Sequence, residues 1–311
     1  MVSYSLNFLI SFSAKLSMDT RKSHLENFSF ILPALIFFCV FSVYPLLKTF
    51  QLSVYTWDGI APVMKFVGLA HYKHIFLNNP VFWKSMGNAG IITLMALTLQ
   101  NAVALLLALI INKNIRGRHI FRAIFFLPPI LSGIVVGLIW KWIYDGNYGI
   151  LNYWLSRLGI SGQYANWAWL SEIKTALISV GIVHIWKGLG YAFILFLAGL
   201  QSIPEDVYEA ARIDGADEWA QFKHITAPLL VPVFAIVSIL TILGTMQIFD
   251  LIYSMTRGGP AGHTSVPITE IYEYMSNGEF GYATTMAIVF GLVLFIVSIA
   301  QIRIAKKMKQ V

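Results

Sequence analysis

Long apolar runs separated by polar segments dominate this 311-residue chain. A helix rises about 1.5 Å per residue, so about 20 apolar residues cross the roughly 30 Å hydrocarbon core of a bilayer. The runs are continuous and do not alternate, which favours membrane helices over barrel strands. They predict an all-α polytopic membrane protein with six transmembrane helices, near Phe28–Phe50, Asn88–Ile111, Phe121–Ile143, Ala176–Leu200, Leu229–Asp250 and Thr284–Ile304.

The composition agrees with lipid as the main solvent. Apolar residues make up 57% of the chain and charged residues only 12%, against roughly 25% charged in soluble domains. The single cysteine, Cys39, excludes an intrachain disulfide framework and a Cys-based zinc site, and we expect it to pack as a small apolar residue. The net charge of +7 is not gathered into one basic stripe, so membrane topology explains it better than nucleic-acid binding.

Lysine and arginine fall unequally on the two sides of the predicted spans. One side carries thirteen: Lys15, Arg21, Lys22, Lys113, Arg116, Arg118, Arg122, Arg212, Lys223, Arg303, Lys306, Lys307 and Lys309. The other carries six: Lys65, Lys73, Lys84, Arg157, Lys174 and Arg257. The positive-inside rule therefore predicts that both termini are cytoplasmic.

This topology divides the chain into three parts. We expect a cytoplasmic N-terminal segment over residues 1–27, a transmembrane domain over 28–305 and a basic cytoplasmic tail over 306–311. No basic region precedes the short apolar patch at 6–12, so a signal peptide is not expected. Residues 1–17 are interpreted as an upstream extension or a segment lying on the membrane surface.

The cytoplasmic loop over residues 201–228 has a helical pattern. Pro204 suits a first helical turn, the acids that follow it complement the helix dipole, and Gly215 can end the helix. A second short helix is predicted from Asp217, with Trp219 and Phe222 on one face. Such an amphipathic hairpin is suited to dock into a groove of a soluble partner and to pass motion to the attached spans.

The same loop resembles a known motif. Glu209-Ala210-Ala211, Gly215, Ile225 and Pro228 resemble the EAA loop of the permease subunits of ABC importers. The resemblance implies a type I ABC importer permease in the bacterial inner membrane. It also implies a contact between a separate ATPase subunit and the coupling residues Glu209, Ala210, Ala211, Asp214 and Gly215. Ala227 stands where the family usually has Leu, which puts local packing in doubt.

The resemblance covers about Ile31 to Lys307 and favours the carbohydrate branch, typified by maltose and glycerol-3-phosphate permeases. Segments of the chain carry it, among them 126–129, 146–152, 186–191 and 249–260. It implies a second homologous permease subunit, two ATP-binding subunits, an extracellular or periplasmic binding protein and a sugar as partners. The chain has no Walker A pattern, so ATP and Mg are expected on the partner ATPase, with no cofactor, metal or catalytic residue in this chain.

Two spans carry candidate residues for a substrate path. Lys187 lies inside the fourth predicted span, where a charge costs about 2.5–3.5 kcal/mol, so it should face a polar interior. Trp186 and Tyr191 can stack on the apolar faces of sugar rings; in the carbohydrate branch the positions matching these three residues border the path. Helix packing and interfacial anchoring are the alternative for the two aromatics.

The fifth span adds Thr241, Thr245, Gln247 and Asp250. Thr241 and Thr245 are one turn apart on one helix face, which suits a polar lining. Alternatively, each threonine bonds only its own backbone. Asp250 can pair with Lys187 only if the two helices are offset in depth.

Other functions remain as alternatives. The permease can serve a different solute, such as one of glycerol-phosphate type. A secondary transporter would more often have inverted repeats, interrupted helices and mid-membrane acids, and a membrane enzyme would need a convergent catalytic cluster. His71 and His74 have the spacing of a metal pair, but no further ligand accompanies them, so we expect them in a solvated loop.

Overall fold

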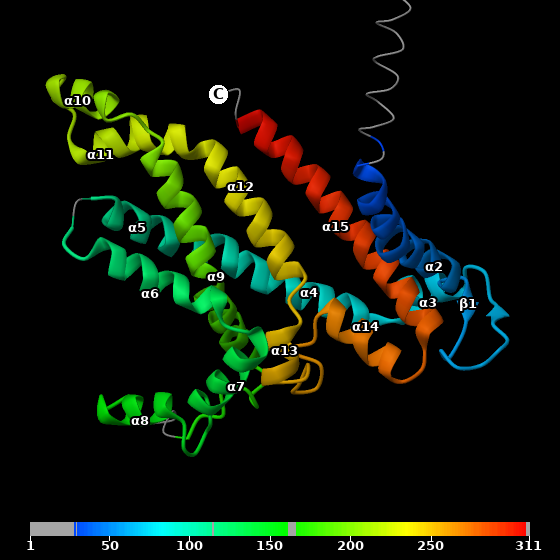
Figure 1. Cartoon of the computed structure of the whole chain (residues 1–311). Coiled ribbons are helices and arrows are strands. Elements are labelled where there is room, and N and C mark those ends of the chain that lie inside the picture. The colour runs from blue at the N-terminus through cyan, green and yellow to red at the C-terminus, as the bar shows by residue number, and fades with distance from the viewer. Residues whose placement is uncertain (1–27, 29, 114, 161–165, 309–311) are drawn as a thin grey trace, which may run out of the picture.

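The structure is a computed structural model that describes residues 28, 30–113, 115–160 and 166–308. Helices form nearly all of its regular structure (Figure 1). They are η1 (Cys39–Val43), α2 (Tyr44–Leu52), α3 (Ala70–Asn78), α4 (Pro80–Met95), η2 (Ala96–Gln100), α5 (Asn101–Asn112), α6 (Arg118–Ile130), α7 (Gly133–Ile143), α8 (Ile150–Arg157), α9 (Ala176–Gln201), α10 (Glu205–Ile213), α11 (Glu218–Gln221), η3 (Phe222–Thr226), α12 (Ala227–Met246), α13 (Asp250–Met255), α14 (Pro267–Ser276) and α15 (Phe280–Met308), where η marks a π-helical turn. Strands β1 (Tyr55–Thr56) and β2 (Lys65–Phe66) pair antiparallel.

Five of the six predicted spans are continuous helices. Among the described residues, these helices are Phe30–Leu52, Pro80–Asn112, Ala176–Gln201, Glu218–Met246 and Phe280–Lys306. The prediction for the fourth span is confirmed almost to the residue. The second and fifth helices begin well before the predicted spans, because polar turns that precede each apolar stretch belong to the same helix.

The third predicted span is wrong as a single helix. It consists of α6 and α7, which are bent by 98° relative to each other at a short break. Pro128 and Pro129 lie in the last turn of α6 and supply no N–H groups to continue the helical ladder. Leu131 and Ser132 then take extended backbone conformations, with ψ of 141° and 135°. Interrupted helices therefore do not separate this chain from the secondary-transporter alternative.

The second arm of the predicted hairpin is also not a separate helix. It runs without a break from Glu218 through η3 into α12 and ends at Met246. The wide turn of η3, closed by the Ala227 N–H on the Phe222 carbonyl, accommodates Pro228 without a kink that ends the helix. Asp250 does not end the fifth span as predicted, because it begins the separate helix α13.

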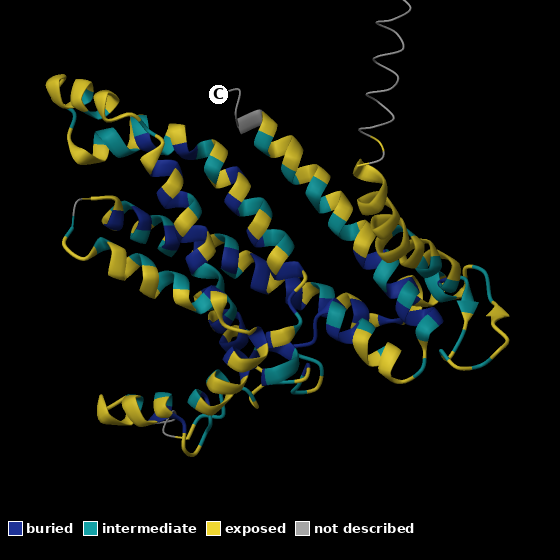
Figure 2. Cartoon of the chain, viewed as in Figure 1, coloured by how far each residue is buried: buried dark blue, intermediate teal, exposed yellow. Residues whose placement is uncertain are grey.

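The two hydrophobic clusters of the core lie at opposite ends of the bundle. One joins α4, α13, α14 and the start of α15, around Phe82, Ile252 and Met286. The other joins α5, α9 and α12 around Phe193 and Phe196. Most large apolar side chains elsewhere are exposed (Figure 2), as expected for a surface that faces lipid.

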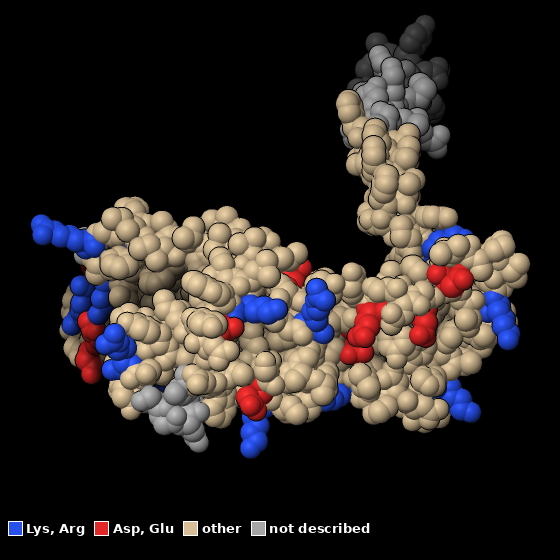
Figure 3. All heavy atoms as spheres, turned by 90° about the horizontal axis from the view of Figure 1, so that it is seen from below, with Lys and Arg blue, Asp and Glu red and all other residues tan. Residues whose placement is uncertain are grey.

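The N-terminal helix 30–52 is set apart from this core. No residue of its most apolar stretch is buried. Its first part, residues 30–47, carries no acidic or basic side chain and projects from the bundle as a column, while charges are scattered over the body of the protein (Figure 3); Lys48 is the one charged residue of this helix. Cys39 lies in this helix and is exposed, not packed as expected.

The arrangement of the loops agrees with the predicted topology. The α10–α11 hairpin, the α5–α6 link and the end of α15 lie on one side, whereas α8, α13, α14 and the β1–β2 hairpin lie on the other (Figure 1). The first side holds the basic loops of the sequence, which the positive-inside rule places in the cytoplasm. Residues 1–27 and 309–311, which belong to the predicted terminal segments, lie outside the described residues.

Cysteine labelling tests this orientation. In a Cys39→Ser background, Glu218→Cys should react with an impermeant maleimide only after the cytoplasmic side is opened, because Glu218 is on the hairpin. Ile60→Cys, at a site that is 90% exposed between β1 and β2, is the matched control and should react from outside in intact cells. The reverse pattern would overturn the orientation.

Close packing of α9 against α6 depends on Gly190. A Cβ at this position would lie 2.4 Å from the Phe125 carbonyl oxygen and 2.7 Å from Pro129 Cγ. Gly190→Ala must therefore separate the helices at a cost of about 1–3 kcal/mol, and it should lower the unfolding temperature in detergent. Gly291→Ala in α15 is the control, because nothing lies within 4 Å of its Cβ position. Equal unfolding temperatures for the two variants would contradict this packing.

Candidate functional site

A cavity of about 750 Å³ lies between α9, α12 and α13, beside the break that separates α6 from α7. Its volume falls in the range of about 300–1,000 Å³ that small-molecule sites occupy. Six of the seven predicted path residues line it, namely Lys187, Tyr191, Thr241, Thr245, Gln247 and Asp250. The structure thus brings these side chains together, and their contact with a solute stays a prediction.

Trp186 is the exception. It is not among the residues that line the cavity, and its ring packs edge-on against Trp140, with centroids 5.5 Å apart. Neighbouring residues of an α-helix point about 100° apart. Since Lys187 faces the cavity, Trp186 is turned toward α7 and supports the wall from behind.

The threonine hydroxyls of α12 bond across helices. Thr245 Oγ1 lies 2.9 Å from His184 Nε2 on α9, and Thr241 donates to Asn101 Oδ1 on α5 at 3.2 Å. The alternative in which each threonine bonds only its own backbone therefore does not hold. These bonds fix α12 against both neighbours in the wall of the cavity.

The two charged residues of the cavity remain apart. Ion pairs in the described part of the chain join Lys113 to Glu218 and Arg212 to Glu205, so Lys187 and Asp250 do not form one. Asp250 instead packs on the break, where a Cβ at Gly133 would lie 2.9 Å from Asp250 Oδ2. Lys187 is therefore available to a polar group in the cavity.

The cavity wall also contains Gln100, Phe126 and Phe249, of which none was a predicted path residue. Gln100 and Asn101 are adjacent amides in an otherwise apolar run. That interruption was the sequence signal for a polar wall in the second span. The position of Phe126 depends on the bend after α6, which the apolar pattern did not predict.

His71 and His74 lie on helix α3 and not in a solvated loop as expected. His71 Nε2 is 3.3 Å from Thr56 Oγ1, and His74 Nδ1 is 2.9 Å from the Tyr282 hydroxyl. Burial lowers the pKa of His71 below its ordinary value. No group of three metal-ligating side chains occurs among the described residues. The hydrogen bond of His71 joins α3 to β1, and that of His74 joins α3 to the start of α15.

The turn of the hairpin is built as its sequence predicts. Gly215 has a positive φ of 82°, which glycine adopts without steric cost. The N–H of Ala216 bonds the Ala211 carbonyl at 2.9 Å and so closes the end of α10. Asp217 then caps α11 by accepting the Ala220 N–H at 2.7 Å.

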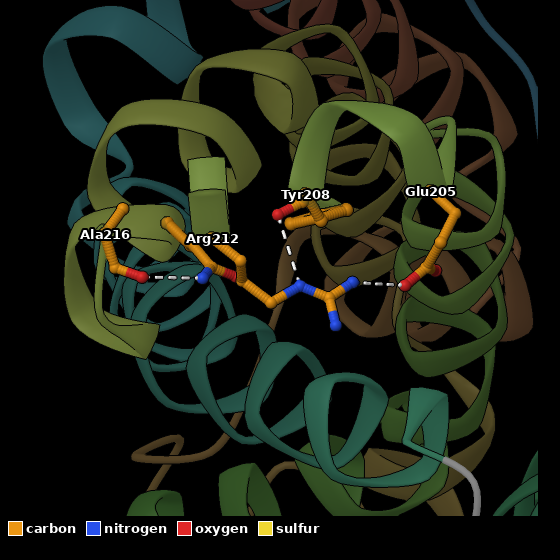
Figure 4. Close-up of polar contacts among 5 residues, drawn as sticks. Glu205, Tyr208, Arg212 and Ala216 are labelled. Atoms are coloured by element: carbon orange, nitrogen blue, oxygen red, sulfur yellow. Dashed lines mark hydrogen bonds and ion pairs between the residues drawn. The ribbon is translucent and has the colours of Figure 1, made fainter. Parts of the chain in front are cut away.

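Polar contacts along the hairpin hold its two arms in a fixed relation. Arg212 reaches Glu205 at 2.9 Å and the Tyr208 carbonyl at 3.3 Å (Figure 4). The Tyr208 hydroxyl lies 2.9 Å from Thr226 Oγ1 on the second arm. This last bond joins α10 to η3, which continues into α12.

The outer face of the hairpin is exposed. Glu209, Ala210, Asp214 and Gly215 are exposed and Ala211 is half-buried. The large apolar side chains of Ile213 and Trp219 are 87% and 68% exposed. The hairpin thus presents apolar as well as charged side chains on its outer face.

These features define a polytopic helical membrane protein with a solute-sized cavity between its spans and an exposed hairpin on one side. Residues 100–310 match the family described as the inner-membrane component of binding-protein-dependent transport systems. The chain belongs to this family. Its members are membrane permease subunits and not enzymes. The match confirms the family that the sequence motifs indicated.

Individual relatives are similar over most of their length. The chain is 36% identical to the trehalose/maltose transport system permease protein MalF of Thermococcus litoralis, over 85% of this chain and 88% of the relative. It is 33% identical to the lactose transport system permease protein LacF of Rhizobium radiobacter, over 93% and 97%. A crystal structure of a bacterial ABC transporter involved in alginate import has the same fold, with a TM-score of 0.81, 23% identity and coverage of 94% and 99%.

Proposed function

We propose that this chain is a permease subunit of an ATP-driven importer and forms the path for a sugar or oligosaccharide. The observation that carries the proposal is the cavity, which combines Tyr191 with polar groups from three helices. Sugars present apolar ring faces and many hydroxyls, so they need aromatic surfaces and paired donors and acceptors. The names of the relatives favour a saccharide among the solutes of this family.

Different partners bind on the two sides of the molecule. A binding protein delivers the solute on the side of α8 and α14. A second homologous permease completes the path, and two ATP-binding subunits, which carry ATP and Mg, dock on the α10–α11 hairpin. Both termini and this hairpin then lie in the cytoplasm of a bacterial cell. Closure of the ATPases moves the hairpins, and continuity of α11 with α12 carries that motion into the cavity wall.

Co-purification tests the proposal. The tagged chain, extracted in mild detergent, should retain a homologous permease and an ATP-binding subunit. The ATPase activity of the complex should rise when a saccharide-loaded binding protein is added. Isolation of the chain alone, with solute flux driven by an ion gradient, would favour a secondary transporter instead.

A different solute is the second candidate, because Lys187 offers a positive charge without an ion-pair partner in the described residues. An anion such as glycerol 3-phosphate would use it. Uptake assays with trehalose, maltose, lactose and glycerol 3-phosphate separate the two solute classes. We expect saturable uptake of a neutral saccharide, and uptake of the phosphate ester alone would overturn the saccharide assignment.

A further inference from the structure

A buried polar side chain of the cavity wall, that of Gln100, has no hydrogen-bond partner among the described residues. Gln100 ends η2 in the second span and is only 5% exposed. Its Oε1 atom is buried and unpaired, and its amide nitrogen also lacks a hydrogen bond among the described residues. Leaving such a group unpaired destabilises the folded protein, whereas Thr241 and Thr245 of the same wall are paired.

The Gln100 side chain packs against Gly188 of α9. A Cβ built on Gly188 would lie 2.6 Å from Gln100 Oε1 and 3.1 Å from its Nε2. The carboxamide therefore rests directly on the backbone of α9, one residue after Lys187. It occupies the space that a side chain at Gly188 would fill, and no hydrogen bond among the described residues holds it there.

The surroundings of Gln100 are polar on the cavity side. Gln100, Gly188, Lys187 and Thr241 all line the cavity. The next residue, Asn101, accepts from Thr241 and leaves its own Nδ2 unpaired. Two amides with unused hydrogen-bonding atoms thus stand together in an apolar span, at a π-helical turn of the kind that often marks functional sites.

We propose that Gln100 binds a hydroxyl group of the transported solute. A carboxamide both donates and accepts, as a hydroxyl does, so a polyhydroxylated ligand supplies the partner that the protein lacks. Rotation about the terminal side-chain bond, which has a broad energy profile, presents either amide atom to the cavity. This inference rests on the proposed saccharide path and adds the second span to its wall.

Transport of deoxy-saccharides tests this site. The probes are the saccharide among trehalose, maltose and lactose that the wild-type complex transports, and its monodeoxy derivatives, in proteoliposomes with binding protein outside and ATP inside. In wild type, removal of one particular hydroxyl should lower the maximal uptake rate about tenfold, as expected for loss of one buried hydrogen bond. Gln100→Met keeps the side-chain length but removes both polar atoms. It should transport the parent sugar about tenfold more slowly and be insensitive to the loss of that hydroxyl.

Two further variants complete the test. Thr98→Val is the control, because Thr98 lies in the same π-turn and bonds the Leu94 carbonyl on the exposed side; it should keep the wild-type pattern. Gly188→Ala must displace the carboxamide and should reproduce the selectivity of Gln100→Met, which covers the case that Gln100→Met does not assemble. The Gln100 site would be overturned if each deoxy derivative lowered the uptake rate by the same factor in wild type, in Gln100→Met and in Gly188→Ala. If wild type transports none of the saccharides, the proposed function itself fails, and the hydroxyl assignment fails with it.

Discussion

Gly215→Val is expected to disrupt the transmission between the ATPase subunits and this chain, so that transport and solute-stimulated ATP hydrolysis are both impaired. Gly215 has a φ of 82° and no atom within 4 Å of its Cβ position, so the penalty is conformational and not steric crowding. A side chain in this left-handed region costs about 1–2 kcal/mol, and a β-branched one more. The chain relieves this strain by leaving the left-handed turn, which changes the angle between α10 and the helix that continues into α12.

Uptake and saccharide-stimulated ATPase activity should therefore fall together, by about tenfold or more, while the binding protein still docks. Gly215→Asn is the matched control, because asparagine tolerates positive φ, and it should retain most of the coupling.

Glu209→Lys tests the docking face independently. Glu209 is exposed and forms no ion pair in the described structure, so charge reversal should impair ATPase retention and not folding. Wild-type coupling in both Gly215→Val and Glu209→Lys would mean that the hairpin does not transmit motion.

The second large effect is expected in the cavity. Tyr191→Ala should lower uptake about tenfold while the complex still assembles and hydrolyses ATP. Tyr191 is 58% exposed in this chain and meets Phe126 edge-on at 5.8 Å, so its removal opens the aromatic wall without disturbing the core. Combining it with Thr245→Val, which removes the contact to His184, should lower uptake further.

The comparison for this pair is Phe295→Ala, which removes an aromatic ring that is 63% exposed on α15 and outside the cavity lining. Its uptake and ATPase activity should match wild type. Uptake kinetics unchanged by the Tyr191 and Thr245 double substitution would place the path elsewhere.

The hairpin was predictable because its geometry is encoded locally. Gly215 and Asp217 act on residues within one turn, so their spacing alone indicates the turn and the cap. Continuity of α11 with α12 was not predictable in the same way, since Pro228 usually ends a helix and η3 has no recognisable pattern.

The cavity was only partly predictable from the sequence, because it depends on contacts between spans that are distant in the chain. Lys187 indicated a polar interior because a charge in a span is costly, and helical spacing placed Thr241 and Thr245 on one face. The 98° bend between α6 and α7 comes from the missing N–H groups of Pro128 and Pro129, which a hydropathy pattern does not report. Gln100 was missed for the same reason, because its role arises from contact with Gly188 on another span.

Vectorial uptake in proteoliposomes tests whether this chain forms the path of an ATP-driven importer. The purified complex is reconstituted with its binding protein outside, ATP and Mg inside, and a labelled saccharide from the panel above. We expect accumulation against a gradient that requires both the binding protein and ATP, and that is lost with Gly215→Val in this chain. Accumulation without ATP, driven by a proton or sodium gradient, would contradict it.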